Sequence, residues 1–339
     1  MRPVRFAAAH LAAWAALPLA DVFSVHDAFA QMRSEPTEHF GICDASAGAP
    51  VGLNLFVVAN DEDNQLRLYR RDVAGGPVSS IDLNSFLAPD PSSPETDIEG
   101  AARVGDRVYW ITSHGANARG KRRASRHRFF ATDVSVAGER VTIAPVGAPY
   151  TRLLKDLAAA PALERYDLTK AAKISAEKPG GLNIEGLGAT PQGSLLIGFR
   201  NPVPKGKALI VPLENPNELL QGKAAKLGPP ILLSLGGRGV RAIAYFADRG
   251  RYLIVAGPHD DRGAFGLYEW SGLASDEPRL LEHISFSGLQ PEALVVYPDE
   301  RERVQIFSDD GAKPVDGKSC KDDGVKPESR SFRSAWIRP

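Results

Sequence analysis

Residues 183–202 read NIEGLGATPQGSLLIGFRNP, and this stretch contains the pattern on which the fold depends. A polar residue and a glutamate precede a short apolar segment, a turn with Pro and Gly follows, and a second apolar segment ends in polar residues. Two such segments joined by a Gly-containing turn are typical of a β-hairpin. The same order recurs in DIEGAARVGDRVYWITSHGAN (97–117), VRAIAYFADRGRYLIVAGPHDD (240–261) and QPEALVVYPDERERVQIFSDDG (290–311).

A fifth, incomplete copy, LNLFVVANDEDNQLRLYRRD (53–72), supplies a second strand, a polar segment and a third strand. Antiparallel strands that recur with alternating polarity and turn residues are the pattern of propeller blades. We therefore predict an all-β fold, a β-propeller of five or six blades, as a single domain over residues 31–339. Residues 140–150 or the C-terminal RSFRSAWIRP are expected to complete a further blade or to close the ring.

Three segments interrupt the repeats. Residues 151–179 have leucines at helical spacing, which predicts a partly helical insertion packed over the propeller. The basic run RGKRRASRHR (119–128) is expected to be a solvated loop or an anion collector over one end of the channel. Residues 311–330, rich in Gly, Pro, Asp and Lys, are expected to form a long surface loop.

Composition limits the functional class. The chain has 339 residues, of which 43% are hydrophobic, and its 41 Lys and Arg balance its 41 Asp and Glu. Proteins that bind nucleic acid or membrane surfaces generally carry a marked basic excess, so neither partner is expected.

The first 30 residues have the features of a signal peptide. A basic start, MRPVR, precedes an apolar stretch, and Ala28–Phe29–Ala30 is a small-x-small cleavage site. We expect an exported protein, periplasmic or secreted, with no membrane span in the mature chain and acting as a monomer. A retained membrane anchor is the alternative.

The chain has two cysteines, Cys43 and Cys320, close to the two ends of the mature protein. In an oxidising compartment two such thiols are expected to pair. Two buried free thiols are the alternative.

Propeller geometry predicts where the charged residues of the repeats meet. The first strand of each blade begins at the same rim of the central channel to which the second strand returns. Glu99, Glu185, Arg241 and Glu292 begin the first strands. Residues that follow the second strands join them on that rim: Asn60, His114, Arg200, Asp309 and Asp310.

Three neighbouring carboxylates repel one another, and burial increases the cost unless a cation compensates. Arg241 is one candidate cation, and a bound metal ion is the other. A ligand set of carboxylate and amide oxygens without thiolate suits calcium. We expect Glu99, Glu185, Glu292, Asp310 and Asn60 as metal ligands. The alternative is an internal network of ion pairs around Arg241.

The combination DIEGAA…YWITSHG, NIEGLGATPQGSLLIGFRNP and QPEALVVYPD…QIFSDDG resembles a bacterial family known as domain of unknown function 3616, over most of the mature chain. A glutamate that opens several inner strands is also loosely similar to calcium-dependent propeller enzymes, the gluconolactonase-like, paraoxonase-like and phytase-like esterase groups. This second likeness implies that Glu99, Glu185 and Glu292 bind metal. Arg241 departs from it, because it replaces the acidic residue in one blade.

The sequence has no G-x-S-x-G, H-E-x-x-H or phosphate-loop motif, which argues against nucleophilic serine or cysteine catalysis. We predict a calcium-dependent hydrolase of esters, lactones or phosphoesters, acting on a small-molecule, glycan or phosphoester ligand at the channel mouth. His114 or Asp309 would move the proton, and Arg200 or Arg241 would hold the developing negative charge. The alternative is a non-catalytic propeller that binds a ligand or a protein.

Overall fold

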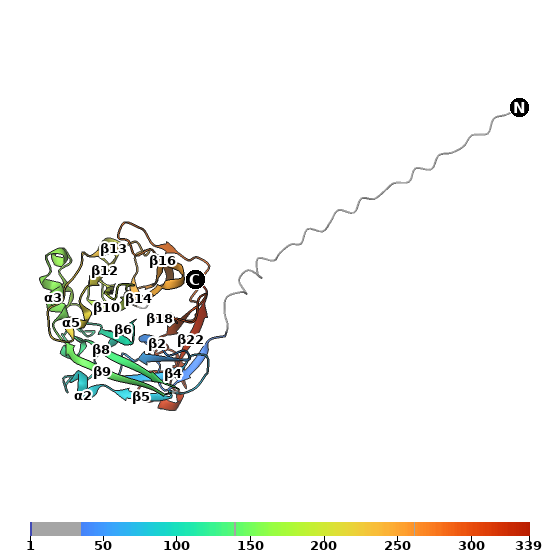
Figure 1. The fold of residues 1–339 in the computed structure, drawn as a ribbon, viewed down its shortest axis with the longest axis horizontal. Coiled ribbons are helices and arrows are strands. Elements are labelled where there is room, and N and C mark those ends of the chain that lie inside the picture. Colours follow the sequence, from blue (N-terminus) through green and yellow to red (C-terminus); the bar gives the residue numbers. More distant parts are fainter. Residues whose placement is uncertain (2–34, 139, 261) are drawn as a thin grey trace. The chain divides into compact units, whose positions relative to one another are not determined.

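The structure is a computed structural model that describes residue 1 and residues 35–138, 140–260 and 262–339. The predicted signal peptide lies outside the described residues, except for Met1, so export stays a prediction. The described residues from 35 onward form one compact unit, in which five four-stranded antiparallel sheets are arranged in a ring (Figure 1). The predicted β-propeller is confirmed, and it has five blades.

The blades are numbered here by the chain order of their innermost strands. Blade 1 contains β2 (Ala47–Val51), β3 (Leu55–Ala59), β4 (Gln65–Arg70) and β5 (Ser79–Asp82). Blade 2 contains β6 (Ile98–Val104), β7 (Arg107–Thr112), β8 (Phe129–Ala137) and β9 (Arg140–Tyr150). Blade 3 contains β10 (Asn183–Ala189), β11 (Leu195–Asn201), β12 (Ala208–Leu213) and β13 (Ile231–Leu233). Blade 4 contains β14 (Gly239–Phe246), β15 (Arg251–Gly257), β16 (Gly266–Trp270) and β17 (Arg279–Leu280). Blade 5 contains β18 (Pro291–Val295), β19 (Val304–Ser308), β22 (Ser331–Ile337) and β1 (Thr37–Phe40).

The innermost strands contact one another in the cyclic order β2, β6, β10, β14 and β18, and β18 returns to β2. A separate hydrophobic cluster fills each of the five interfaces between neighbouring blades. The middle strands are apolar on both faces because each blade packs against two neighbours. In β11, for example, all seven residues are buried. The hydrophobic core is thus distributed around the channel, which leaves polar side chains free to occupy its mouth.

The two ends of the domain close the ring together. β1 pairs with β22 in antiparallel register, with Thr37 opposite Ser334, so the N-terminal strand completes the blade that contains the C-terminus. Residues 140–150 form the fourth strand of blade 2, and β22 is the third strand of blade 5, so neither begins a sixth blade. Cys43 and Cys320 form a disulfide, which settles the alternative of two free thiols.

The helical elements lie between strands. The predicted insertion contains α3 (Leu153–Ala159), a 3-10 helix at Pro161–Tyr166 and α4 (Leu168–Ala171), whose leucines join the cluster between blades 2 and 3. α2 (Asn84–Leu87) links blades 1 and 2, and α5 (Pro216–Leu219) precedes β13. Single 3-10 turns occupy Ala124–Arg126, Pro204–Gly206, Ala247–Arg249 and Pro327–Ser329. Residues 311–330 include the small hairpin of β20 (Pro314–Val315) and β21 (Lys318–Ser319).

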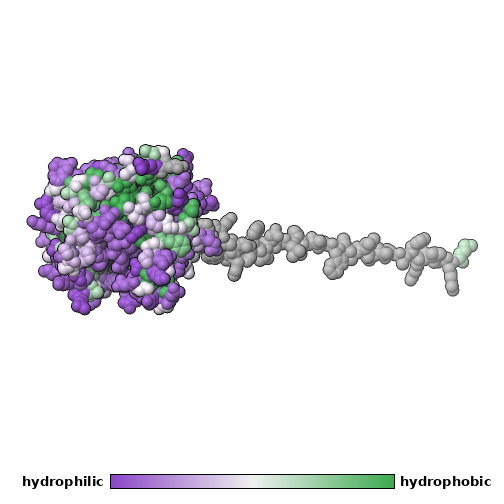
Figure 2. All heavy atoms as spheres, turned by 90° about the horizontal axis from the view of Figure 1, so that it is seen from below, coloured by the Kyte–Doolittle hydropathy of each residue, from purple (hydrophilic) through white to green (hydrophobic). Residues whose placement is uncertain are grey.

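The molecular surface is mostly hydrophilic, with a hydrophobic area on the face shown in Figure 2. Exposed Leu53, Val73, Val78 and Val136 line a surface cavity of about 710 Å³ at blades 1 and 2. Among the described residues, no helix is long and apolar enough to cross a membrane.

Candidate functional site at the channel mouth

The charged residues of the repeats enter the channel through a β-bulge that four inner strands share. In blade 2, Ile98 and Gly100 pair with the consecutive residues Thr112 and Ile111, so Glu99 is the extra residue. The corresponding extra residues of blades 3, 4 and 5 are Glu185, Arg241 and Glu292. A bulge changes the direction of the side chain it carries, and here it repeats at the same place in each strand.

The predicted meeting of these residues is seen in the structure. Glu99, Glu185 and Glu292 line one cavity of about 10 Å³ in the channel. That volume is no more than about one water molecule requires. Blade 1 contributes Ser46 to the same cavity, and the Ser46 hydroxyl donates to the carbonyl oxygen of Ile98 at 2.7 Å.

Two arginines compensate part of this charge. Arg200 Nη1 donates to Glu185 Oε1 at 2.7 Å, and Arg241 Nη1 lies 3.4 Å from Glu185 Oε2. Arg241, which is wholly buried, also donates to Glu292. Burial raises the pKa of Glu292 well above its usual value, Arg241 opposes this effect, and Asp309 adds to it. Arg200 and Arg241 therefore form ion pairs with the glutamates of the ring. This is the internal network of ion pairs that we considered as the alternative to a metal site.

Blade 2 places further acidic groups above this ring. Asp97 has a left-handed backbone conformation, with φ of 61°. Its Oδ2 lies 2.9 Å from Nη1 of Arg126, and Arg126 also forms an ion pair with Glu95. Arg126, which belongs to the basic run at 119–128, thus balances part of the negative charge at the channel mouth. Burial, together with Asp97 and Glu185, raises the pKa of Glu99 well above its usual value. Burial and Asp97 raise the pKa of Glu95 to about 7.

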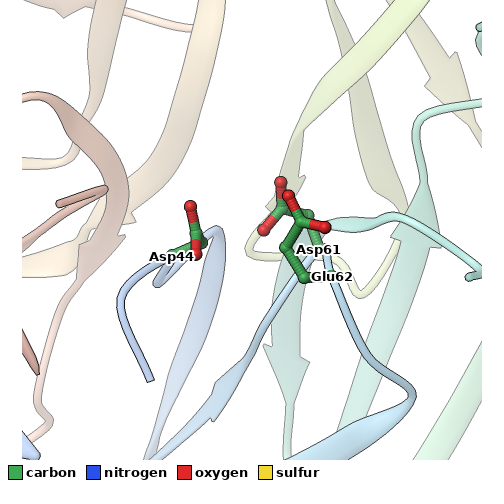
Figure 3. A group of neighbouring side chains, drawn as sticks. All are labelled: Asp44, Asp61 and Glu62. Carbon is green, nitrogen blue, oxygen red and sulfur yellow. The ribbon is translucent and has the colours of Figure 1, made fainter. Parts of the chain in front are cut away.

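Blade 1 and the segment that leads into it carry a second acidic group on the same side. One carboxylate oxygen from each of Asp44, Asp61 and Glu62 lies within 4.8 Å of the others (Figure 3). Asp44 comes from the segment before β2, and the other two come from the loop after β3. Asp44 is 2% exposed. Oδ1 of Asp44 and Oδ1 of Asp61 are buried and accept no hydrogen bond from the described residues.

The charge of this group is incompletely balanced. Lys321 Nζ lies 3.2 Å from Glu62 Oε1 and 4.0 Å from Asp44 Oδ1. Burial and the neighbouring Asp309 raise the pKa of Asp44 to about 8, although Lys321 opposes them. Burial, Asp44 and Asp309 raise the pKa of Asp61 well above its usual value. The group therefore holds protons near neutral pH or requires a cation.

Asp61 follows the second strand of the incomplete repeat, the position expected on this rim, but Asp44 is harder to recognise from the sequence. Asp44-Ala-Ser-Ala-Gly matches the position of Asp97-Ile-Glu-Gly-Ala in blade 2, so Asp44 and Ser46 correspond to Asp97 and Glu99. Because β2 reads AGAPV, it lacks the large apolar residues by which the other inner strands are recognised. The remaining sign that Asp44 lies at this rim is its position directly after Cys43.

The other predicted site residues have different surroundings. Asp309 is opposite Asp44 in an isolated β-bridge, and its Oδ1 accepts from the amide of Gly311 at 2.7 Å. Asp310 forms a bidentate pair with Arg333, at 2.7 and 2.6 Å. Asn60 Oδ1 accepts from the amide of Glu62 at 2.9 Å and so shapes the loop that carries the acidic group.

His114 is set back from the mouth. It is fully buried with φ of 54°, and its Nδ1 lies 2.8 Å from the carbonyl oxygen of Thr112. Its ring centre is 5.3 Å from that of His127. Burial lowers the pKa of His114 to about 4, so the imidazole is neutral at pH 7. This environment suits a structural histidine better than one that exchanges protons with a substrate.

Comparison with known proteins bears on family and fold. Residues 147–304 match the family described as "Protein of unknown function (DUF3616)", which confirms the family resemblance. No curated protein matches the chain.

Similar solved structures include glutaminyl cyclase of Myxococcus xanthus, at 12% identity, with 91% of this chain and 96% of that chain covered and a TM-score of 0.46. The PQQ-bound aldose sugar dehydrogenase of Streptomyces coelicolor is 10% identical, with 90% and 98% covered and a TM-score of 0.44. The β-propeller domain of Cps50 (Swd1) from Myceliophteria thermophila is 10% identical, with 91% and 99% covered and a TM-score of 0.39. Likeness at this level carries no argument about activity.

Proposed function

We propose that this propeller is an exported hydrolase of esters, lactones or phosphoesters that uses a divalent cation at the channel mouth, and that this cation is calcium. The observation that carries the proposal is the group of Asp44, Asp61 and Glu62, whose carboxylate oxygens lie within 4.8 Å of one another. Export is supported by the disulfide between Cys43 and Cys320, since such bonds persist mainly in oxidising compartments.

The group fits a hard cation by its chemistry. All the donors are carboxylate oxygens, and two of them are buried without a hydrogen bond from the described residues. Calcium takes six to eight oxygen ligands with tolerant geometry, and such oxygens are its usual partners. Asp309 lies beside this group, opposite Asp44 in the β-bridge. Glu185, Glu292 and Asp310, expected as ligands from the sequence, are instead engaged with arginines.

The cation would supply Lewis acidity, polarising the oxygen of the bond to be broken. Asp309, half-buried beside Asp44, is placed to accept the proton of an attacking water. The water oxygen bonds to the acyl carbon or phosphorus, the bond to the leaving oxygen breaks, and that oxygen takes the proton from Asp309. Lys321 is partly exposed at the same group, so it is better placed than Arg200 or Arg241 to meet developing negative charge.

The test combines binding with activity. In EDTA-treated protein, calcium at about 100 times its Kd should raise the melting temperature by about 5 °C or more, because it binds only the folded state. D44N/D61N should lose this shift, and D106N, at a side chain that is 89% exposed, should keep it. Chromogenic acyl and phosphate esters should be hydrolysed with calcium and not with EDTA. Identical melting curves for the wild type with EDTA and with millimolar calcium would overturn the proposal.

A non-catalytic propeller that binds a small molecule, a glycan or a protein is the second candidate. It is favoured by the network in which Arg241 joins Glu185 and Glu292, since such a network rigidifies the mouth without any chemistry. Calcium binding without hydrolysis of any ester would favour this candidate over the first.

A further inference from the structure

A cavity of about 820 Å³ lies at the mouth side of blades 4 and 5. It is formed by the loop between β15 and β16, the connection from β17 to β18, the residues after β19, and β22. Its volume falls within the range of small-molecule sites. Of the residues that line it, only Asp309 has a role in the proposed function.

One side of this cavity is apolar. Phe265, Ile284, Phe286 and Leu289 line it, and Phe286 and Leu289 are 6% and 8% exposed. The ring centre of Phe265 lies 5.3 Å from the guanidinium carbon of Arg241. Phe265 therefore contacts the charged ring of the channel and also lines the cavity. A hydrophobic acyl or aryl group would remove this surface from water on binding.

The cavity adjoins the candidate reacting group. Asp309 lines it, and the same residue lies opposite Asp44 in the β-bridge described above. A ligand whose apolar part occupies the cavity would thus present its polar end to Asp309. This arrangement, an apolar pocket with a few convergent polar groups, is typical of small-molecule sites.

The charged side chains of the cavity favour uncharged esters over phosphate monoesters. Its lining contains three acidic and two basic side chains, and both bases already have carboxylate partners. Lys313 Nζ lies 3.3 Å from Glu38 Oε1, and Arg333 forms the bidentate pair with Asp310. Asp309 and Glu282 form no ion pair with another described residue, and they would repel a phosphate monoester dianion. An uncharged carboxylic ester meets no such repulsion.

On the basis of the proposed function, we propose that this cavity binds the acyl or aryl part of uncharged carboxylic esters and lactones, and that it excludes phosphate monoesters. The proposal assigns Ile284, half-buried on the apolar wall, as a specificity-determining residue. Asp309 at the polar end would meet the ester group.

Binding can be measured apart from hydrolysis. The uncharged ketone 2-acetylnaphthalene, an unreactive analogue of an aryl ester, should bind the calcium-free wild type in isothermal titration, whereas 1-naphthyl phosphate should not. I284D should weaken ketone binding by about tenfold or more, since it places a charge against the apolar group. L273D, at a side chain that is 60% exposed outside the cavity, should bind as the wild type does. Both variants should retain the wild-type far-UV spectrum.

Activity then separates the two proposals. With calcium, kcat/KM for 2-naphthyl acetate should exceed that for 1-naphthyl phosphate by about 100-fold or more. Preference for the phosphate ester would overturn the assignment of the cavity and leave the hydrolase intact. Ketone binding that I284D weakens, without hydrolysis of either ester, would support the cavity and overturn the hydrolase. Absence of ketone binding by the wild type would overturn the assignment of the cavity.

Discussion

Arg241 is wholly buried in the channel, and its guanidinium pairs with both Glu185 and Glu292. Removing one partner of a buried ion pair leaves an uncompensated charge, which costs about 3–5 kcal/mol. We therefore expect R241M to lower the free energy of unfolding by about that amount at pH 7. The double variant R241M/E292Q should recover part of the loss, because it removes one of the two carboxylates left behind.

Urea unfolding of the wild type and of both variants measures this coupling. The deficit of R241M should shrink as the pH is lowered, since Glu292 can then bind a proton in place of the arginine. Equal losses for R241M and R241M/E292Q would show that Arg241 acts by packing alone.

The raised pKa values at the mouth predict a pH dependence of the free energy of unfolding. A carboxyl group whose pKa is raised by folding stabilises the protein below its unfolded pKa, and the stabilisation is lost as the pH rises through its folded pKa. For Asp44 that upper limit is about 8, and for Glu95 about 7. Below pH 6.5, burial has the opposite effect at His39, His114 and His127, because it lowers the pKa of each imidazole. The window that isolates the carboxyl groups is therefore pH 6.5 to 8.

Within this window the free energy of unfolding in EDTA should fall as the pH rises, by about 1.4 kcal/mol per pH unit for each proton held only by the folded state. D44N should reduce the slope, and saturating calcium should also reduce it, since a bound cation replaces the protons of Asp44 and Asp61 but not those of Glu95. Urea unfolding at several pH values provides the measurement. If D44N leaves the dependence of the unfolding free energy on pH unchanged, Asp44 does not titrate in this window.

The bulge of the inner strands is the element that brings charge into the channel, and small residues beside it allow blades to approach closely. A Cβ added at Gly100 would lie 2.6 Å from the carbonyl oxygen of Glu185 and 2.8 Å from Cγ2 of Ile111. We expect G100A to destabilise the protein by about 1–3 kcal/mol, because blades 2 and 3 must separate. G76A, where a Cβ would meet nothing within 4 Å, is the matched control. Thermal unfolding compares them, and equal melting temperatures would show that the blades tolerate the added methyl group.

The repeated elements explain how far the sequence predicted the site. A glutamate or arginine followed by a small residue and an apolar strand is a local pattern, so Glu99, Glu185, Arg241 and Glu292 were placed correctly in one ring. The sequence also named Arg241 as a compensating cation, and it pairs with Glu185 and Glu292. The role of Arg126 was not predictable, because it reaches Asp97 through a loop whose path the repeats do not specify. The burial of His114 depends on packing against His127, which is also invisible in the repeat.

At the scale of the whole molecule, the prediction left the number of blades open because closure is non-local. Blade 5 takes β22 from the C-terminus and β1 from the N-terminus, so no contiguous stretch contains it. The acidic group is subject to the same limit. Asp44 follows Cys43 and Lys321 follows Cys320, and only the closed ring brings these two positions together.

The disulfide should stabilise the closed ring mainly by lowering the conformational entropy of the unfolded chain. Cys43 and Cys320 are 277 residues apart, and a crosslink over a loop of this length is expected to contribute about 5 kcal/mol in the chain-entropy model. C43S/C320S should therefore unfold at a lower guanidinium concentration than the oxidised wild type, and the reduced wild type should match the variant.

The variant should still fold, because the pairing of β1 with β22 closes the ring independently. Its calcium-induced shift in melting temperature should be smaller, since Asp44 and Lys321 are no longer held together by their neighbouring cysteines. An unfolding midpoint equal to that of the oxidised wild type would mean that strand pairing alone determines closure.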